Sequence, residues 1–416
     1  MENKTNHIPV LLEQVLKYLD PKEGEKYLDL TAGYGGHARK VLERTLQATK
    51  ATLVDRDRQA VDELASQKEL NGAEIIHEDF LTASLKLLEQ GRQYNLILAD
   101  LGVSSPHLDN ASRGFSIRAN GPLDMRMDSS QVLTAETIVN SYSEAELVKL
   151  LREYGEEPKA RTIARVIVAN RPIATTHELA DIISKAWHGH SPPRRIHPAT
   201  KSFQALRIAV NDELGLLKKA MPIWLELLAP GGRIAIISFH SLEDRLTKEF
   251  FREYTGDRYD APLRLLTKKP VTANEDELVS NPRARSAKLR AAVKINIKGR
   301  GSNADTGQKP LPSVQGSRQS DVTTYACACL IRFAADEEVT KNKNKNRKQK
   351  IYDLLKFSGN GPATIRCQPA KHHASQRKRA DAWSSQQYNY VGNIGMFTGV
   401  VVPYAGDQNQ RIELQD

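Results

Sequence analysis

Four short apolar or β-branched runs, separated by amphipathic segments, occupy the first hundred residues of the chain. The runs span 27–30, 51–54, 74–77 and 95–99, and amphipathic segments such as 37–48 and 58–68 lie between them. Strands that alternate with helices in this way form βαβ units, whose strands run parallel in one sheet. A fifth run over 233–239 follows the turn Pro230-Gly231-Gly232 and an apolar helix over 221–228. The alternation therefore predicts an α/β fold.

More than a hundred residues separate the fourth run from the fifth, whereas a whole βαβ unit needs only about 30 residues. Helical periodicity appears over 143–154, 160–170 and 177–187. We therefore predict an all-helical insert over 106–198, between two parts of the α/β domain at 1–105 and 199–298. A second independent domain would not explain why a strand returns at Arg233. We expect 200–217 to form one long helix that packs back on the sheet.

Residues 299–416 have a different composition from the rest of the chain. The segment 299–320 is rich in Gly, Ser, Pro and Gln, and 341–350 is a low-complexity basic run, which cannot build a hydrophobic core. This segment carries +7 of the net charge of +10. We expect a disordered basic tail, and the overall charge therefore says little about what the folded part binds.

The cysteines and the apolar runs exclude several classes of protein. All three cysteines, Cys327, Cys329 and Cys367, lie in the tail, so disulfides, cysteine nucleophiles and zinc-thiolate sites are excluded before it. No metal site is predicted. The N-terminal residues are polar, and no apolar run reaches the ~18 residues of a membrane span. We expect a cytoplasmic protein without membrane association.

The first run leads directly into a glycine-rich turn that contains Gly33, Gly35, Gly36 and His37. Glycines permit a tight turn and the close approach of a ligand at the carboxyl end of a strand. The second run ends at Asp55, a position suited to binding ribose hydroxyls. These features fit a nucleotide-dependent oxidoreductase as well as a methyltransferase. Alternatively, the glycines are required only by the geometry of the turn and bind no ligand.

The ends of the third and fourth runs favour a methyltransferase. The third run ends in Glu78-Asp79-Phe80 and the fourth at Asp100, so carboxylates or rings would follow neighbouring strands on one rim. S-adenosylmethionine needs such a rim, because its adenosine must be held while its sulfonium faces the methyl acceptor. The alternative is that Asp79 and Asp100 only cap the helices that follow them.

Ordered motifs across residues 7–298 resemble the ribosomal RNA small-subunit methyltransferase H family, which methylates N4 of a cytidine in 16S rRNA. They include Arg113-Gly-Phe-Ser116, His197-Pro-Ala-Thr200 and Ser238-Phe-His-Ser-Leu-Glu-Asp-Arg245. The resemblance implies a Rossmann-like class I methyltransferase, with 16S rRNA of the small ribosomal subunit as its partner. It implies cofactor contacts at Gly35, Gly36, His37, Asp55, Phe80, Asp100 and His107. His107 stands where the family usually has glutamine, and the family ends near Lys298.

The loop after the fourth run carries the residues that we expect to act on the substrate amine. Ser104-Ser105-Pro106 resembles the loop with which amino-group methyltransferases accept the amine hydrogens, although a second proline and an aromatic residue are absent. A purely structural turn is the alternative. Phe115 either stacks on an extruded base or packs in the hydrophobic core. His240, Glu243, Asp244 and Arg245 are candidates for lining the RNA entrance. The alternative is that Glu243 and Arg245 only pair with each other along a helix start.

Two groups of basic residues are candidates for contacts with RNA phosphates. Arg194, Arg195, Lys201 and Arg207 lie around the end of the insert, and Arg283, Arg285, Lys288 and Arg290 form the second group. Any of them could instead be an ordinary surface residue. A DNA amino-group methyltransferase and a non-catalytic rRNA-binding assembly factor are the alternative functions, and the sequence predicts no oligomeric state.

Overall fold

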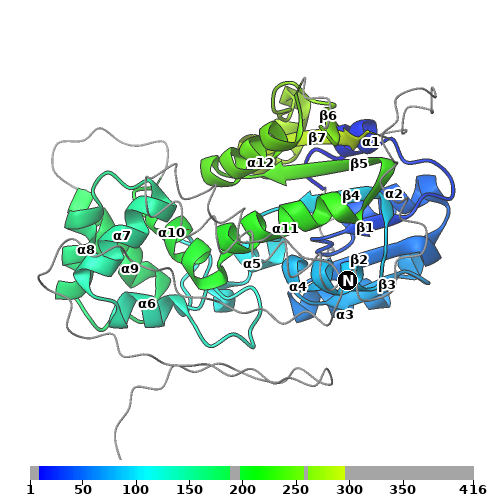
Figure 1. Ribbon diagram of the computed structural model, residues 1–416. Helices are drawn as coiled ribbons and strands as arrows, with labels where there is room; N and C mark the ends of the chain where they lie inside the picture. Colours follow the sequence, from blue (N-terminus) through cyan, green and yellow to red (C-terminus); the bar gives the residue numbers. More distant parts are fainter. Residues whose placement is uncertain (1–8, 188–196, 257–260, 296–416) are drawn as a thin grey trace, which may run out of the picture. The chain divides into compact units, whose positions relative to one another are not determined.

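The computed structural model describes residues 9–187, 197–256 and 261–295 (Figure 1). The tail predicted over 299–416 lies outside these residues, as do Arg194 and Arg195. No helix in the described part of the chain has the length and apolar character required to cross a membrane.

A seven-stranded sheet in the order β3-β2-β1-β4-β5-β7-β6 forms the centre of the fold (Figure 1). β1 to β5 pair in parallel, whereas β7 runs antiparallel to both of its neighbours, β5 and β6. The strands are β1 (Tyr27–Asp29), β2 (Ala51–Asp55), β3 (Glu74–His77), β4 (Tyr94–Asp100), β5 (Leu228–Ser238), β6 (Leu263–Leu265) and β7 (Lys288–Lys294). The predicted α/β fold is confirmed, and the order reverses between β1 and β4, where open α/β sheets bind ligands.

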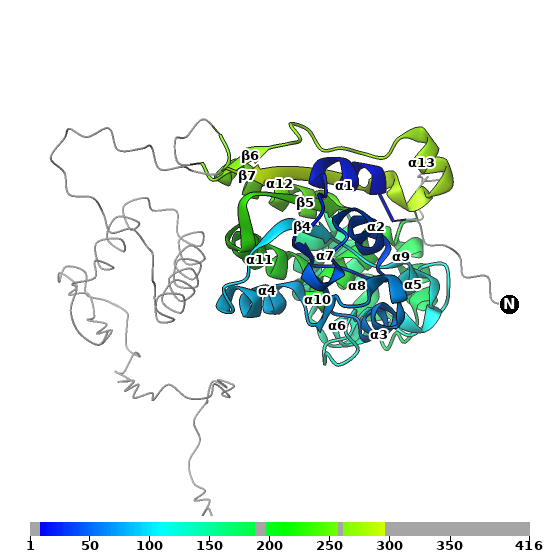
Figure 2. The same ribbon diagram turned by 90° about the vertical axis from the view of Figure 1, so that its right-hand side faces the viewer.

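Helices cover both faces of the sheet, because successive strand residues point to opposite faces. On one face Tyr27, Leu96 and Leu98 pack with α1 (Leu12–Leu19), α2 (Gly36–Thr45) and α3 (Arg58–Ser66). On the other face Leu28 and Ile97 pack with α4 (Phe80–Glu89), α11 (Glu213–Leu227) and α12 (Ser241–Tyr254). In Figure 2, α4 and α11 lie on one side of β4 and α2 and α3 on the other. This burial on both faces explains why the parallel strands are almost wholly apolar.

A second hydrophobic core lies in the helical region inserted between β4 and β5. Its helices are α6 (Ala135–Ser141), α7 (Glu144–Gly155), α8 (Ala160–Ala169), α9 (Thr176–Trp187) and α10 (Thr200–Asn211). Short elements complete the described chain: α5 (Ser105–Asp109), α13 (Glu275–Ser280), and 3₁₀ turns at Ala48–Lys50, Lys68–Leu70, Ala111–Arg113 and Pro282–Ser286.

The helix predicted over 200–217 is two helices, because the backbone of Asp212 takes a left-handed conformation with φ 47°. α10 buries Phe203, Leu206 and Val210 in the core of the helical region, and only α11 packs on the sheet, beside α4. We therefore propose that the inserted region extends to Asn211 instead of ending at residue 198.

Candidate functional site

Three aspartates lie at the carboxyl ends of β1, β2 and β4, which are adjacent strands of the sheet. Asp29 is buried and accepts hydrogen bonds from the Tyr27 hydroxyl (2.7 Å) and the Thr31 backbone N–H (3.2 Å). Burial raises the pKa of Asp29 to about 7 in spite of these bonds. Asp55 accepts the backbone N–H groups of Gly33 (2.7 Å) and Asp57 (2.8 Å), and burial raises its pKa as well.

Of the three carboxylates, Asp100 has the fewest described hydrogen bonds to offset the cost of its burial. Its Oδ1 is buried and has no hydrogen-bond partner among the described residues. Burial raises the pKa of Asp100 well above its usual value, and the charges of Asp29 and Glu243 raise it further. Asp100 does not cap α5, because Ser104 holds the N-cap position of that helix. This carboxylate is therefore available for a donor or a cation that approaches the rim.

The glycine-rich turn joins β1 to α2 and lies beside Asp100. Gly35 has φ 75°, and a Cβ atom there would lie 2.9 Å from Leu70 Cδ1, while a Cβ atom on Gly36 would lie 2.7 Å from Pro9 Cγ. Packing within the chain thus accounts for both glycines, whether or not a ligand approaches them. The Thr31 hydroxyl accepts the backbone N–H of Asp100 at 2.6 Å and so fixes the turn to the end of β4.

His37, the second residue of α2, is buried beneath Asp100. Its Nε2 lies 2.9 Å from the Val10 carbonyl oxygen, so this nitrogen must carry the proton, since two acceptors would repel. Its Nδ1 lies 3.6 Å from Asp100 Oδ2. His37 Nδ1 is therefore close to Asp100 but beyond hydrogen-bond distance of its carboxylate.

Phe80 begins α4 at the end of β3, at the position predicted to contact adenine. Its ring packs edge-on against Trp224, with 5.6 Å between the ring centroids, and it remains partly exposed. The preceding Asp79 accepts the backbone N–H groups of Leu81 and Thr82. The capping interpretation thus applies to Asp79 but not to Asp100.

The loop after β4 leads into α5, where His107 is buried between two protein partners. Its Nδ1 lies 3.0 Å from Ser104 Oγ, and its Nε2 lies 2.7 Å from Asp57 Oδ2. A cofactor contact through a ring nitrogen, as the family resemblance implied, would require one of these contacts to break. Pro106 lies in the first turn of α5, and the backbone of Ser105 starts that helix.

Phe115 belongs to the core of the helical region, where it is 7% exposed. Its ring lies 5.0 Å from the ring of His107, measured between centroids. The geometry therefore favours the core interpretation of Phe115 over stacking on an extruded base.

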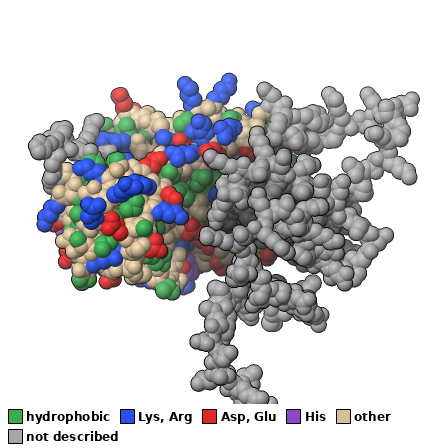
Figure 3. Space-filling view, turned by 60° about the vertical axis from the view of Figure 1, so that its left-hand side comes forward, with side chains coloured by type: hydrophobic (Ala, Val, Ile, Leu, Met, Phe, Trp, Pro, Cys, Tyr) green, Lys and Arg blue, Asp and Glu red, His purple; other side chains and the backbone are tan. Residues whose placement is uncertain are grey.

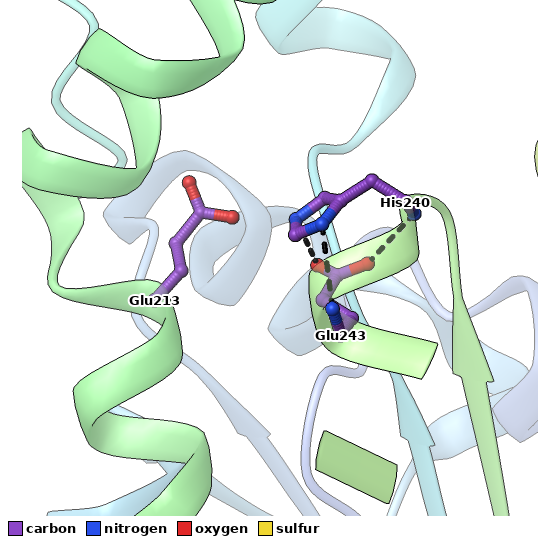
Figure 4. A group of neighbouring side chains, drawn as sticks. All are labelled: Glu213, His240 and Glu243. Carbon is purple, nitrogen blue, oxygen red and sulfur yellow. Dashed lines mark hydrogen bonds and ion pairs between the residues drawn. The ribbon is translucent and has the colours of Figure 1, made fainter. Parts of the chain in front are cut away.

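His240, Glu243 and Glu213 form a second polar group, beyond the end of β5 (Figure 4). Glu243 accepts the backbone N–H groups of Phe239 (2.7 Å) and His240 (3.2 Å). Arg245 pairs with Glu156, not with Glu243 as the helix-start alternative expected. One ligand atom from each of the three residues lies within 4.8 Å of the others, a spacing that could hold a cation. Arg207 already binds both oxygens of Glu213, at 2.8 Å each.

The other residues of the α12 start also pair within the protein. Asp244 accepts Arg290 Nε at 2.8 Å, and Arg245 Nη2 lies 2.8 Å from Glu156 Oε1. The second of these contacts joins α12 to the end of α7 in the helical region.

The predicted RNA-binding arginines differ in how far they are exposed. The guanidinium of Arg207 is only 16% exposed and is neutralised by Glu213, a geometry that favours a role in holding that glutamate. Arg283 is exposed and pairs with Asp109 at 2.6 Å, and Arg285 is exposed. On the face shown in Figure 3, Lys and Arg side chains lie among Asp and Glu side chains. Among the predicted RNA-binding arginines that the structure describes, Arg283 and Arg285 therefore remain candidates for phosphate contacts.

A family model described as the MraW methylase family matches residues 4–295. The chain belongs to this family. A relative named "Ribosomal RNA small subunit methyltransferase H" from Synechocystis is 48% identical over 298 residues, covering 70% of this chain and 94% of the relative. A relative with the same name from Halothermothrix orenii is 44% identical over 310 residues, covering 70% and 98%. Among solved structures, TrmN from Thermus thermophilus matches 68% of this chain and 48% of its own, at 13% identity and TM-score 0.32.

S-adenosylmethionine is the cofactor of this methyltransferase family, and the residues at the rim fit it. The cofactor supplies a methyl group on a positively charged sulfur and also carries an ammonium group. The rim provides three partly or wholly buried carboxylates, one of which has an oxygen without a hydrogen-bond partner. A cationic ligand would offset the repulsion that raises the pKa of Asp100.

Two residues of the site were missed from the sequence. Asp57 follows Asp55 by two positions and contacts His107, and Glu213 lies in α11 opposite His240. An aspartate directly before a helical segment is typical of an N-cap, and Asp57 does accept the Gln59 N–H. Nothing in the pattern of residues near Glu213 indicates its partners.

Proposed function

We propose that this chain transfers a methyl group from S-adenosylmethionine to N4 of a cytidine in the decoding region of 16S rRNA. The single observation that carries the proposal is the position of Asp100, whose unpartnered carboxylate oxygen ends β4 four residues before Ser104. The curated relatives' shared name, which specifies small-subunit ribosomal RNA, supports the substrate. A ribosomal substrate would place the reaction in the cytoplasm.

The chemistry requires alignment more than a strong base. The exocyclic amine of cytosine is a weak nucleophile because its lone pair is delocalised into the ring, and attack on a sulfonium disperses charge. The protein must therefore orient the amine and exclude water. We propose that the Ser104 hydroxyl and a backbone carbonyl in the loop 104–106 accept the two amine hydrogens, which directs the lone pair toward the methyl group.

The target base must leave its stack to reach this loop. Exposed basic side chains would bind the phosphates on either side of the extruded nucleotide. Arg283 and Arg285 are the candidates within the part of the chain that the structure describes. Arg194 and Arg195 stay predictions from the sequence.

Mass mapping of 16S rRNA from cells that lack the protein tests the proposal. We expect one cytidine to lose a methyl group, and we expect wild-type protein to restore it while the Asp100→Asn variant does not. An unchanged cytidine would exclude the rRNA assignment and leave a DNA amino group as the alternative acceptor. Restoration by Asp100→Asn would remove Asp100 from the active site.

A further inference from the structure

The antiparallel end of the sheet, formed by β7 and the outermost strand β6, carries basic residues without acidic ones (Figure 1). The segments 261–273 and 282–295, which contain these strands, have three and five Lys or Arg residues respectively, and neither has Asp or Glu. Four of these side chains are exposed and form no ion pair with any residue that the structure describes. They are Arg264, Lys268, Lys269 and Arg285, and we call them the basic edge.

Two members of the basic edge, Lys268 and Lys269, lie in a bulge of the outermost strand. On either side of them the chain hydrogen-bonds to β7, through Thr267 at 3.0 and 3.3 Å and through Val271 at 2.8 and 2.9 Å. Three residues stand between these two attachment points, whereas the partners on β7 are separated by Arg290 alone. Extra residues on one strand of an antiparallel pair bulge from the ladder, and both lysines are accordingly exposed.

This lysine bulge is connected in register to the carboxyl end of β4. Asp100 pairs with Ile237 on β5. Ile237 pairs in turn with Leu289 on β7, which pairs with Val271 at the end of the bulge. Neighbouring strands lie about 4.8 Å apart, so three such steps place the backbone of Val271 about 14 Å from that of Asp100. The lysine bulge therefore lies near the rim at which we propose that methyl transfer occurs.

Acidic groups neutralise other basic residues of the two segments. Arg283 pairs with Asp109 in α5. Asp244 on α12 binds both Lys288 and Arg290. The first turn of α13 adds exposed acidic residues beside the 3₁₀ turn that contains Arg283. Positive charge without a described carboxylate partner therefore remains mainly on β6 and at the lysine bulge.

Protection of the sheet edge accounts for part of this pattern. Lysines, prolines and bulges on an outermost strand prevent it from pairing with the strands of other proteins, and Lys269-Pro270 suits that purpose. Edge protection does not require β6 and β7 to lack acidic residues, since opposite charges on paired strands would add stability. A surface with one sign of charge instead matches a polyanionic partner.

We propose that the basic edge binds backbone phosphates of 16S rRNA a few nucleotides away from the methylated cytidine. The RNA would run from the loop after β4, past the ends of β5 and β7, to the outermost strand. Contacts with phosphates fix the position of a nucleic acid without reading its sequence, and lysines bind phosphates as point charges. Such contacts would help to offset the cost of extruding the target base. This inference rests on the proposed function and adds a path for the RNA.

The test compares two double variants that each remove a pair of adjacent exposed lysines. Lys268→Gln/Lys269→Gln alters the basic edge, and Lys218→Gln/Lys219→Gln on α11 is the matched control. Methylation of isolated small ribosomal subunits gives KM and kcat, and binding at several salt concentrations reports the number of phosphate contacts.

For the edge variant we expect a KM for small subunits about 10-fold higher, an unchanged kcat, and a slope of log affinity against log salt smaller by about 2. The α11 variant should match the wild-type protein in all three quantities. Lys268→Arg/Lys269→Arg should also match it, because the charge is kept. All of these proteins should bind S-adenosylmethionine equally well.

The outcomes separate the inference from the function on which it rests. A wild-type enzyme that methylates the cytidine, with an edge variant of unchanged KM and salt slope, would overturn the inference alone. Equal losses in the edge and α11 variants would also overturn it, since any pair of surface lysines would then suffice. A wild-type protein that methylates no small-subunit cytidine would overturn both.

Crosslinking of wild-type protein on small subunits identifies the partner and does not depend on a variant that folds. A lysine-directed crosslinker should join the peptide containing Lys268 and Lys269 to 16S rRNA, and mass spectrometry should find no RNA on Lys218 or Lys219. A crosslink from Lys268 or Lys269 to a ribosomal protein in place of RNA would overturn the inference.

Discussion

We propose that three single residues at the rim, Asp29, Asp55 and Asp100, favour ligand binding at the expense of stability. Their carboxyl groups lie at the ends of adjacent strands, and burial raises the pKa of each one. Like charges close together in a region of low dielectric repel, which disfavours the folded state without its ligand. A bound cation would relieve the repulsion, and we therefore propose that the same groups contribute to cofactor affinity.

Asp100→Asn separates these two effects. The amide keeps the shape of the side chain but removes its charge, so we expect affinity for S-adenosylmethionine to fall by about 10- to 100-fold, the loss of a charge-assisted hydrogen bond. The free energy of unfolding without cofactor should be unchanged or higher, because repulsion from Asp29 and Glu243 is gone. Calorimetric titration and urea unfolding measure the two quantities. Wild-type affinity in this variant would remove Asp100 from the cofactor site.

Asp29 should make the cofactor-free protein less stable as pH rises. Its pKa is about 7 when folded and about 3.9 when unfolded, so between these values the folded state holds a proton that the unfolded state lacks. The stabilisation is full below about pH 4 and is lost as pH rises through about 7, with at most about 4 kcal/mol at stake. Urea unfolding at both ends of this window should show a smaller pH dependence for Asp29→Asn. Equal slopes for the two proteins would contradict the assignment.

At the scale of elements, the junction of α10 and α11 depends on Asn211. Its buried amide accepts the Met127 backbone N–H (2.9 Å) and donates to the Met125 carbonyl (2.8 Å), so it holds the loop before α6 against the end of α10. The helix break follows at Asp212, a position where neither glycine nor proline signals one. The sequence therefore predicted a single helix, since the cause of the break is a contact with residues more than 80 positions away.

Asn211→Ala should lower the free energy of unfolding by about 2–3 kcal/mol, because it leaves a buried N–H and a buried carbonyl without partners. Asn71→Ala, an exposed asparagine at the end of a 3₁₀ turn, serves as the control and should change stability by less than about 0.5 kcal/mol. Chemical unfolding followed by circular dichroism gives both values. Similar small losses in the two variants would show that the amide contacts contribute little.

Local patterns predicted the strands of the parallel half of the sheet, because β1, β2 and β4 are largely buried and mostly apolar, and β3 keeps two adjacent isoleucines. β7 was missed, since Lys288, Arg290 and Lys294 interrupt its apolar residues, and Lys288 and Arg290 were interpreted as RNA contacts. Two of these basic side chains instead bind Asp244 on α12. Asp100 was predictable from its place at a strand end, but the Asp57–His107 contact was not, because it joins residues 50 positions apart.

At the scale of the whole molecule, residues 9–295 contain the complete sheet and the helical region, and the family match ends at residue 295. We expect deletion of 299–416 to leave affinity for S-adenosylmethionine within about twofold of the full chain, since the rim residues and the partners that the structure describes for them precede residue 299. Isothermal titration of both proteins checks this. A large loss of affinity would show that the removed segment contributes to the cofactor site.

If the clustered carboxylates at the rim bind the methyl donor as proposed, the cellular amount of this protein would depend on the supply of that donor. A ligand that binds only the folded state stabilises it in proportion to the logarithm of its concentration, and small changes in stability alter how much of a protein escapes proteolysis in cells. A cell short of methionine would hold less of the methyl donor and would degrade this enzyme faster. The supply of donor would thus set the amount of catalyst as well as its rate.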